Sequence, residues 1–336
     1  MKLPIGTSRL RRFRGLCAAL GLALAAGGAA AKDRLTFGLD WTPQAEFGGF
    51  YQAVAEGIYD AYGLDVTIRA GGPQVNTQQL LISGALDLAL AANAFVPLNA
   101  VRENIPYVAV AAFYQKDPQI LVAHPEMGFK TLADLKGHPI LIATFARDTF
   151  WAFLKSKYGF TDDQARPYAF SLQPFLADKT LSQQGYLTVE PFLLRAAGIT
   201  PTVFLLSDYG YDPYANLVMV SKRMVADKPE LIQRFIDASI KGWYGFLKGP
   251  NGKAIDLIIE ADPSYRQQNA IDTLGALKEH GIIDSGDAKT LGIGAMTDRR
   301  WREFFETAVT AGVYRPDLDY RAAYTTQFVG KKVGMP

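Results

Sequence analysis

The sequence has little of the residue types on which many metal and catalytic sites depend. Its 336 residues include one cysteine and three histidines. A single cysteine excludes a disulfide framework and a cysteine-based metal cluster. The histidines, His124, His138 and His280, are too far apart in sequence for a metal-ligand spacing, so we expect no metal and no cofactor. The P-loop, G-x-G-x-x-G and G-x-S-x-G motifs are also absent from the sequence.

An excess of one charge sign is also lacking once the N-terminus is set aside. The formal net charge is +2, and the residues before Lys32 include five basic and no acidic side chains. The rest of the chain therefore has a small acidic excess. This balance excludes the basic surface that binding to nucleic acid or to an anionic membrane requires.

The N-terminus has the pattern of an export signal. A basic segment (1–15) precedes an apolar segment (16–28), and Ala29-Ala30-Ala31 provides an A-x-A cleavage site after Ala31. The apolar segment is shorter than the roughly 20 residues that span a bilayer. A membrane anchor is the alternative, and Arg11-Arg12 leaves a twin-arginine signal open beside ordinary secretion. Cys17 lacks a small residue directly before it, so we expect no lipid anchor.

The remaining chain alternates strand and helix patterns, with no fixed short repeat. We predict strands at 34–39, 64–70, 87–92 and 216–222, and helices at 49–63, 229–248, 252–260, 264–280 and 297–311. Repeated βα units predict largely parallel sheets with helices on both faces. A length near 300 residues favours two lobes, with a ligand between them at the carboxyl ends of the strands.

Several segments together resemble the periplasmic substrate-binding proteins of ABC importers. They are DWTPQAEFGGFYQA, GLDVTIRAGGP, ISGALDLALA, KTLADLKGHPI and GYLTVEPFLLRAAGI. The similarity covers essentially all of 34–330 and is greatest to the branch that includes thiamine-pyrimidine and sulfonate/nitrate binding proteins. In the pyrimidine-precursor branch the first loop often has the pattern W-x-P-N-x-x-H-x-G. Trp41, Pro43 and Gly49 match this pattern, whereas Gln44 replaces Asn and Phe47 replaces His.

This resemblance implies the α/β type II periplasmic binding protein fold, in which two α/β lobes are joined by a two-strand hinge and close on the ligand. We expect the hinge near 113–121 and 213–220. The predicted parts are the signal peptide (1–31), lobe 1 (32–115 and 216–330, the second part including C-terminal helices) and lobe 2 (116–215).

The loop after the first strand supplies the first candidate ligand-binding residues. Trp41 follows a strand directly, and its indole offers a flat surface for stacking on a heteroaromatic ligand. Gly48 and Gly49 open the next helix, where a ligand can approach the backbone and free N–H groups. The alternatives are a core tryptophan and a plain turn or helix cap.

A second group of candidates follows a strand in lobe 2. Tyr186 and Glu190 match a tyrosine and a glutamate four residues apart in the related family. The Glu190 carboxylate can accept hydrogen bonds from an exocyclic amine or pair with a protonated ring nitrogen. Alternatively, Glu190 merely complements the N-terminus of the helix that Pro191 begins.

The remaining candidates lie at strand ends and beside the second hinge. Asn93 and Thr144 end predicted strands, and each can equally act as a helix N-cap. Asp208 and Tyr211 lie in the segment DYGYDP, where they either line the ligand site or pack under the hinge.

The predicted function is the capture of a small heteroaromatic solute, such as a formylaminopyrimidine or hydroxymethylpyrimidine precursor of thiamine. We expect a periplasmic monomer that delivers this ligand to an ABC permease and its ATPase subunit, and that meets the membrane only through the permease. Alternatives are a riboflavin binder and a binder of an alkanesulfonate or nitrate. A pyrimidine-synthesising enzyme of the same fold is disfavoured by the absence of cysteine after the signal, and a transcription regulator by the export signal.

Overall fold

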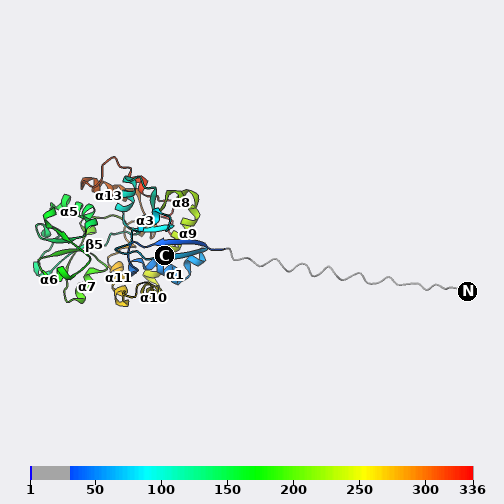
Figure 1. Ribbon diagram of the computed structural model, residues 1–336, viewed down its shortest axis with the longest axis horizontal. Helices are drawn as coiled ribbons and strands as arrows, with labels where there is room; N and C mark the ends of the chain where they lie inside the picture. Colours follow the sequence, from blue (N-terminus) through cyan, green and yellow to red (C-terminus); the bar gives the residue numbers. More distant parts are fainter. Residues whose placement is uncertain (2–30, 336) are drawn as a thin grey trace. The chain divides into compact units, whose positions relative to one another are not determined.

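Two five-stranded sheets form the framework of the residues that the structure describes (Figure 1). The computed structural model describes Met1 and residues 31–335, so the predicted signal peptide lies almost entirely outside the described residues. The first sheet has the order β2-β1-β3-β10-β4. Its strands are β1 (Asp33–Gly38), β2 (Leu64–Arg69), β3 (Leu88–Asn93), β4 (Tyr107–Tyr114) and β10 (Ala215–Ser221).

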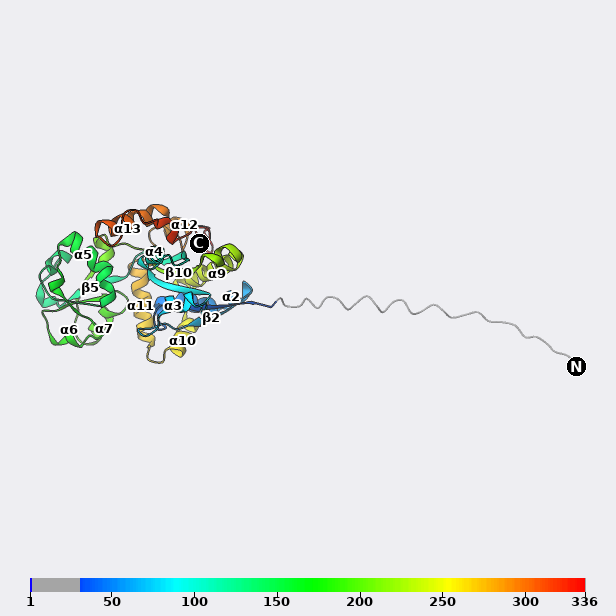
Figure 2. The same cartoon turned by 45° about the horizontal axis from the view of Figure 1, so that its top comes forward.

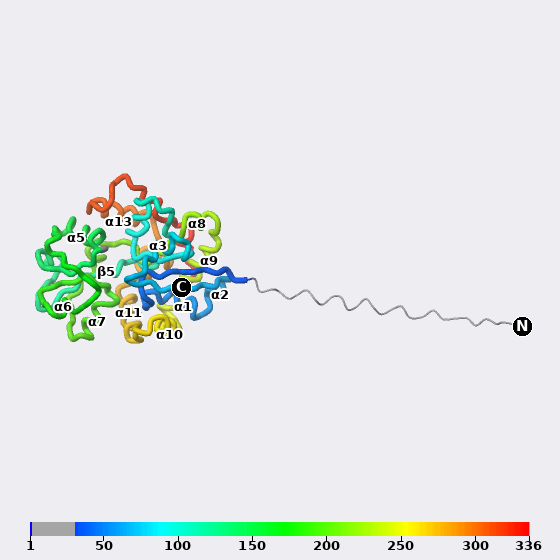
Figure 3. Tube along the Cα trace, viewed as in Figure 1, coloured from blue at the N-terminus to red at the C-terminus, as the bar shows by residue number. Residues whose placement is uncertain are grey.

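The second sheet is built from the middle of the chain and has the order β7-β6-β8-β5-β9. We call each sheet, with the helices packed on it, a lobe: lobe 1 contains the first sheet and lobe 2 the second. The colours of Figure 3 show that the green middle of the chain forms lobe 2, while the blue segments and most of the yellow to red segments belong to lobe 1. The strands of lobe 2 are β5 (Gln119–Ala123), β6 (Ile140–Ile142), β7 (Ala165–Pro167), β8 (Ser182–Tyr186) and β9 (Thr202–Leu205).

Each sheet contains one strand that runs against its neighbours, so the sheets are mixed rather than largely parallel as expected. In lobe 1 this strand is β10, which pairs antiparallel with β3 and β4; in lobe 2 it is β5, which pairs antiparallel with β8 and β9. Both are the first strands after the chain crosses between lobes. The chain enters each lobe at the edge where the other strands end, so the entering strand must run away from that edge.

Helices pack around both sheets. The sequence features that favour a helix are clearest in α9. Its first residue is proline, and its buried residues recur every three or four positions along one face. In Figure 2, α5, α6 and α7 gather around β5. The α-helices are α1 (Gly48–Ala55), α2 (Ile58–Ala61), α3 (Thr77–Ile82), α4 (Phe95–Arg102), α5 (Phe150–Tyr158), α6 (Gln173–Ala177), α7 (Glu190–Ala196), α8 (Lys222–Asp227), α9 (Pro229–Lys248), α10 (Gly252–Ala261), α11 (Gln267–Glu279), α12 (Ala288–Leu291) and α13 (Asp298–Thr310).

The predicted helix over 49–63 is two helices instead of one. Gly57 lies between α1 and α2 with φ +64, in the left-handed region that interrupts an α-helix. Within residues 31–335, every helix is too short or too polar to cross a membrane.

Candidate ligand-binding site

The strand directions bring the predicted site residues to the facing edges of the two sheets. In lobe 1, β1, β3 and β4 end at one edge, where β10 begins. In lobe 2, β6, β7, β8 and β9 end at the edge where β5 begins. Because the connections β4–β5 and β9–β10 cross between these edges, loops from both lobes meet there. We call this region the interlobe layer.

Aromatic rings cross the interlobe layer from one lobe to the other. The ring of Trp41, which follows β1, lies 5.3 Å from the ring of Phe170, which follows β7. The ring of Phe170 lies 5.2 Å from that of Tyr168. The Trp41 loop is held by a hydrogen bond from the Gly71 N–H to the Trp41 carbonyl (3.0 Å). We call Trp41, Phe170 and Tyr168 the aromatic row; it offers flat apolar surface from both lobes.

The carboxylate of Glu190 lies beside the lobe 2 end of the aromatic row. One oxygen accepts a hydrogen bond from the Tyr186 N–H (2.6 Å), and the other accepts one from the Tyr168 hydroxyl (3.3 Å). A Cβ on Gly185 would lie 2.8 Å from the Glu190 side chain, so this close approach requires glycine. Burial raises the pKa of Glu190, although the hydrogen bond from the Tyr186 N–H opposes the rise. Tyr186 thus contacts Glu190, the first residue of α7, through its backbone N–H.

Two acidic residues of lobe 1 in the interlobe layer were not among the sequence-based candidates. Glu46 lies in the short 3-10 helix η1 (Ala45–Phe47) and is 5% exposed. Asp40 lies in the loop after β1, directly before Trp41. Burial raises the pKa of Glu46 to about 7 and that of Asp40 to about 6. The negative charge of Glu190, on lobe 2, also contributes to the raised pKa of Glu46. The position of Asp40 at a strand end was the one available signal.

Asn93 lies at the same edge and contacts the first crossing segment. Its Nδ2 donates to the Asp117 carboxylate (3.2 Å), and its Oδ1 accepts from the Phe95 N–H (3.2 Å). The second bond is a local contact with the first residue of α4, whose N-cap is Ala94 and not Asn93. Burial raises the pKa of Asp117 to about 7. Among residues 31–335, no ion pair involves Asp40, Glu46, Asp117 or Glu190, so the interlobe layer contains carboxyls without cationic partners.

Two other candidates have different surroundings. Thr144 is exposed and begins the 3-10 helix η4 (Thr144–Asp148), directly after β6. Tyr211 is 2% exposed, and its ring packs against Phe95, Phe150 and Phe153. Packing under the hinge therefore accounts for Tyr211.

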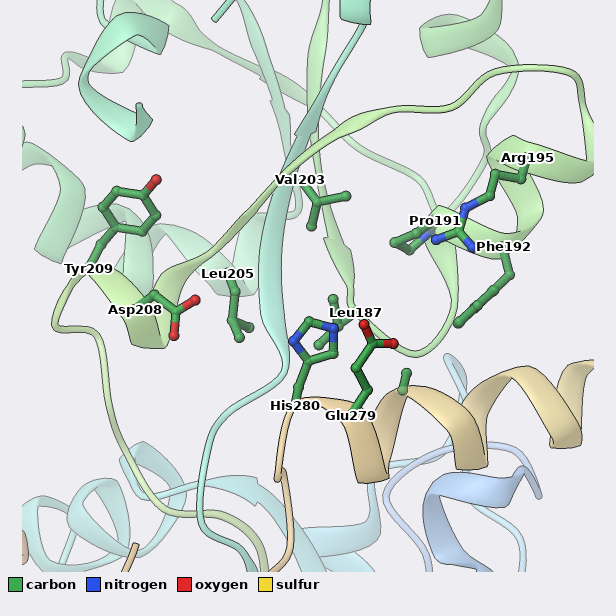
Figure 4. Close-up of a pocket in the computed structure, with 11 residues that line it drawn as sticks. Leu187, Pro191, Phe192, Arg195, Val203, Leu205, Asp208, Tyr209, Glu279 and His280 are labelled. Atoms are coloured by element: carbon green, nitrogen blue, oxygen red, sulfur yellow. The ribbon is translucent and has the colours of Figure 1, made fainter. Parts of the chain in front are cut away.

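Asp208 lines a pocket of about 550 Å³ (Figure 4), which Trp41, Glu46 and Glu190 do not line. The pocket lies between lobe 2 and the C-terminal part of α11. Of the nine candidates, only Asp208, in the 3-10 helix η6 (Leu206–Tyr209), lines it. The pocket is lined by Leu187, Pro191, Phe192, Arg195, Val203, Leu205, Asp208, Tyr209, Ala276, Glu279 and His280.

Gly48 and Gly49 are buried at the start of α1, against α9. A Cβ on Gly48 would lie 2.2 Å from the Phe246 ring, and a Cβ on Gly49 would lie 2.1 Å from the Trp243 ring. Helix packing therefore explains both glycines without a ligand. Within the described part of the chain, no group of three His, Cys, Asp or Glu residues is placed to hold a metal ion.

The buried carboxyls predict that the ligand-free protein becomes less stable as the pH rises. The pKa is raised to about 6 for Asp40 and to about 7 for Glu46 and Asp117, so between about pH 4 and these values each group is largely protonated in the folded protein but ionised in the unfolded chain. The folded state then binds more protons, so the free energy of unfolding falls with rising pH. We expect a lower thermal midpoint at pH 8 than at pH 5, with a smaller difference in Glu46→Gln. A midpoint that rises over this range would contradict the assigned burial.

Comparison with known proteins identifies relatives over most of the chain. A family model described as NMT1/THI5 like matches residues 44–253. The chain is 25% identical over 304 residues to the riboflavin-binding protein RibY of Chloroflexus aurantiacus, covering 88% of this chain and 86% of that protein. It is 27% identical over 235 residues to a formylaminopyrimidine-binding protein of Halalkalibacterium halodurans, covering 66% and 68%.

Solved structures show the same architecture. The alkanesulfonate-binding protein SsuA from Xanthomonas axonopodis pv. citri superposes with a TM-score of 0.60 at 15% identity, covering 88% of this chain and all of that chain. At this identity the likeness concerns the fold alone. It confirms the predicted type II periplasmic binding protein fold.

Proposed function

The chain belongs to the NMT1/THI5-like family, and from this premise we propose that it is the periplasmic solute-binding protein of an ABC importer. The proposed ligand is a small, flat heteroaromatic compound that carries an amine or ring N–H group. It is held between the two lobes and passed to a permease with its ATPase subunit. Binding involves no covalent step. A ligand that contacts both lobes binds the closed form more tightly than the open form, and this difference in affinity shifts the protein towards closure.

One observation carries this proposal: an aromatic row that crosses the interlobe layer ends at a buried carboxylate. Trp41 on lobe 1 and Phe170 on lobe 2 can stack on a flat ring, and Glu190 can accept a hydrogen bond from an amine at its edge. Because Trp41 and Glu190 are on different lobes, a ligand that contacts both favours closure.

The two curated relatives favour two ligands of this class. A formylaminopyrimidine fits the Trp41 and Glu190 pattern and is bound by the Halalkalibacterium relative. Riboflavin is bound by the Chloroflexus relative, which aligns with more of the chain. An alkanesulfonate or nitrate is disfavoured because an anion needs cations or hydrogen-bond donors, whereas Asp40, Glu46, Asp117 and Glu190 mainly supply acceptor oxygens and would repel an anion when ionised.

A thermal-shift panel on residues 32–336 tests this proposal. We expect riboflavin or an aminopyrimidine to raise the thermal midpoint, since ligand at a hundredfold excess over its Kd stabilises by about 2.7 kcal/mol. Hexanesulfonate and nitrate should give no shift. The Trp41→Ala variant should lose about tenfold in affinity, through lost stacking and lost apolar contact. A shift with the anions alone would overturn the proposed ligand class.

A further inference from the structure

The least satisfied polar side chain of the interlobe layer is that of Glu46. It is 5% exposed, and neither carboxyl oxygen has a hydrogen-bond partner among the described residues. Buried carboxyl groups without partners are unfavourable, and native proteins normally pair them. A partner from outside the chain would remove this penalty.

The backbone around Glu46 is fixed by several hydrogen bonds, although neither of its side-chain oxygens has a partner within regular hydrogen-bond geometry among the described residues. The Glu46 carbonyl accepts from the Tyr114 hydroxyl (2.9 Å) and from the Asn216 Nδ2 (3.2 Å). The preceding N–H, of Ala45, donates to the Tyr265 hydroxyl (3.2 Å). These bonds fix the backbone that carries the Glu46 side chain within the interlobe layer. A fixed backbone reduces the cost of ordering this part of the site when a ligand binds.

A hydrogen-bonded chain also holds Glu46 opposite a residue of lobe 2. The Tyr265 hydroxyl is 3.3 Å from the Thr273 hydroxyl, which donates to the Thr188 carbonyl (3.1 Å). Thr188 is 2% exposed, and its own hydroxyl oxygen has no partner within hydrogen-bonding geometry among the described residues. Hydrogen bonding by the Thr188 side chain lowers the pKa of Glu46 against the effect of burial, so the two side chains are neighbours, although their contact lies outside regular hydrogen-bond geometry.

Asp40 adds a second acceptor of the same kind. Its Oδ1 is buried and without a partner in the described part of the chain, and its charge contributes to the raised pKa of Glu46. Two carboxyls and a hydroxyl of the interlobe layer thus have buried oxygens without hydrogen-bond partners among the described residues. Their chemical complement is a group that donates hydrogen bonds.

We infer that Asp40, Glu46 and Thr188 form a second ligand subsite, separate from Glu190, that accepts hydrogen bonds from hydroxyl or amine groups of the bound solute. This inference rests on the proposed function and adds to it. The ligand then carries donors at two positions: one meets Glu190 beside the aromatic row, and the other meets the lobe 1 carboxyls. Both proposed ligand types carry a second donor, the ribityl hydroxyls of riboflavin or the side group of an aminopyrimidine.

Pairs of compounds that differ in the second donor test the subsite. Riboflavin is compared with lumiflavin, which lacks the ribityl chain, and hydroxymethyl-aminopyrimidine with its methyl analogue. We expect Glu46→Gln to weaken the donor-bearing member of the pair at least tenfold in calorimetric titration, and the analogue less than twofold. Asp40→Asn and Thr188→Val should act in the same direction. The control is Glu279→Gln, an exposed acid in the separate pocket, which should leave both affinities unchanged.

Two outcomes overturn the subsite, and they differ from failure of the proposed function. Equal loss for both members of a pair, or no loss in Glu46→Gln, contradicts it while wild-type binding stands. If no panel compound binds wild-type protein, the proposed ligand class fails. The subsite is then tested by native mass spectrometry, which detects any compound that co-purifies with the protein. A co-purified compound retained by Glu279→Gln and lost from Glu46→Gln supports the subsite, whereas equal retention overturns it. Circular dichroism confirms that each variant is folded.

Discussion

Alanine in place of Gly242 is expected to lower the free energy of unfolding by about 1–3 kcal/mol, as overpacked cores do. A Cβ on Gly242, in α9, would lie 2.2 Å from the Gly49 carbonyl oxygen of α1. This oxygen belongs to the backbone and cannot move aside by a side-chain rotation, so the two helices must separate. Urea unfolding followed by circular dichroism measures the change.

Gly275→Ala is the matched control, because it makes the same substitution in another helix. Gly275 is exposed in α11, and a Cβ there would contact nothing within 4 Å. Alanine is the better helix former, so this variant should be more stable by about 0.5–1 kcal/mol. Equal stability of Gly242→Ala and wild type would show that α1 and α9 do not pack this closely. A loss confined to Gly242→Ala supports packing as the role of Gly49.

The second large effect is expected at Glu190, on ligand affinity. Glu190→Gln removes the negative charge but keeps the shape, so the ligand amine loses a charge-assisted hydrogen bond. We expect affinity to fall about 10- to 100-fold, which corresponds to about 1.4–2.7 kcal/mol. Since burial raises the pKa of Glu190, acidification should weaken wild-type binding by protonating this acceptor. The variant should lack that component of the pH dependence.

Asp208→Asn is the control for this measurement. It also neutralises a carboxylate, but Asp208 is exposed and lines the pocket between lobe 2 and α11. We expect its affinity to stay within twofold of wild type in the same titration. Full binding by Glu190→Gln together with weak binding by Asp208→Asn would move the site to that pocket.

Much of the fold could be predicted from hydrophobic spacing. The predicted helix over 229–248 has the bounds of α9, since an initial proline and a regular apolar face mark it strongly. The strands β4 and β5 were not assigned, although the predicted hinge overlaps both. They are buried almost throughout, and a continuous apolar run carries no alternation that identifies a strand. The antiparallel direction of β5 and β10 follows from the crossings between lobes, which no local pattern reveals.

The candidate site could be predicted only where a residue stands at a strand end. Trp41 and Glu190 follow strands, and the structure places both in the interlobe layer; their ligand roles stay predictions. Glu46 lies within the same loop motif as Trp41. From the sequence alone it cannot be distinguished from an exposed acidic residue, because its burial is visible only in the folded structure. Phe170 and Tyr168 follow the short strand β7, which the sequence pattern did not indicate. The position of Tyr211 near the hinge leaves both a ligand contact and packing open, and its burial shows that packing accounts for it.

A crystal structure of residues 32–336 with the compound that gives the largest thermal shift tests the central claim most directly. We predict a ring stacked on Trp41 within the interlobe layer, with a donor group at hydrogen-bonding distance from the Glu190 carboxylate. A ligand bound in the pocket between lobe 2 and α11, or an anion bound in the interlobe layer without contact to Trp41, would contradict the account.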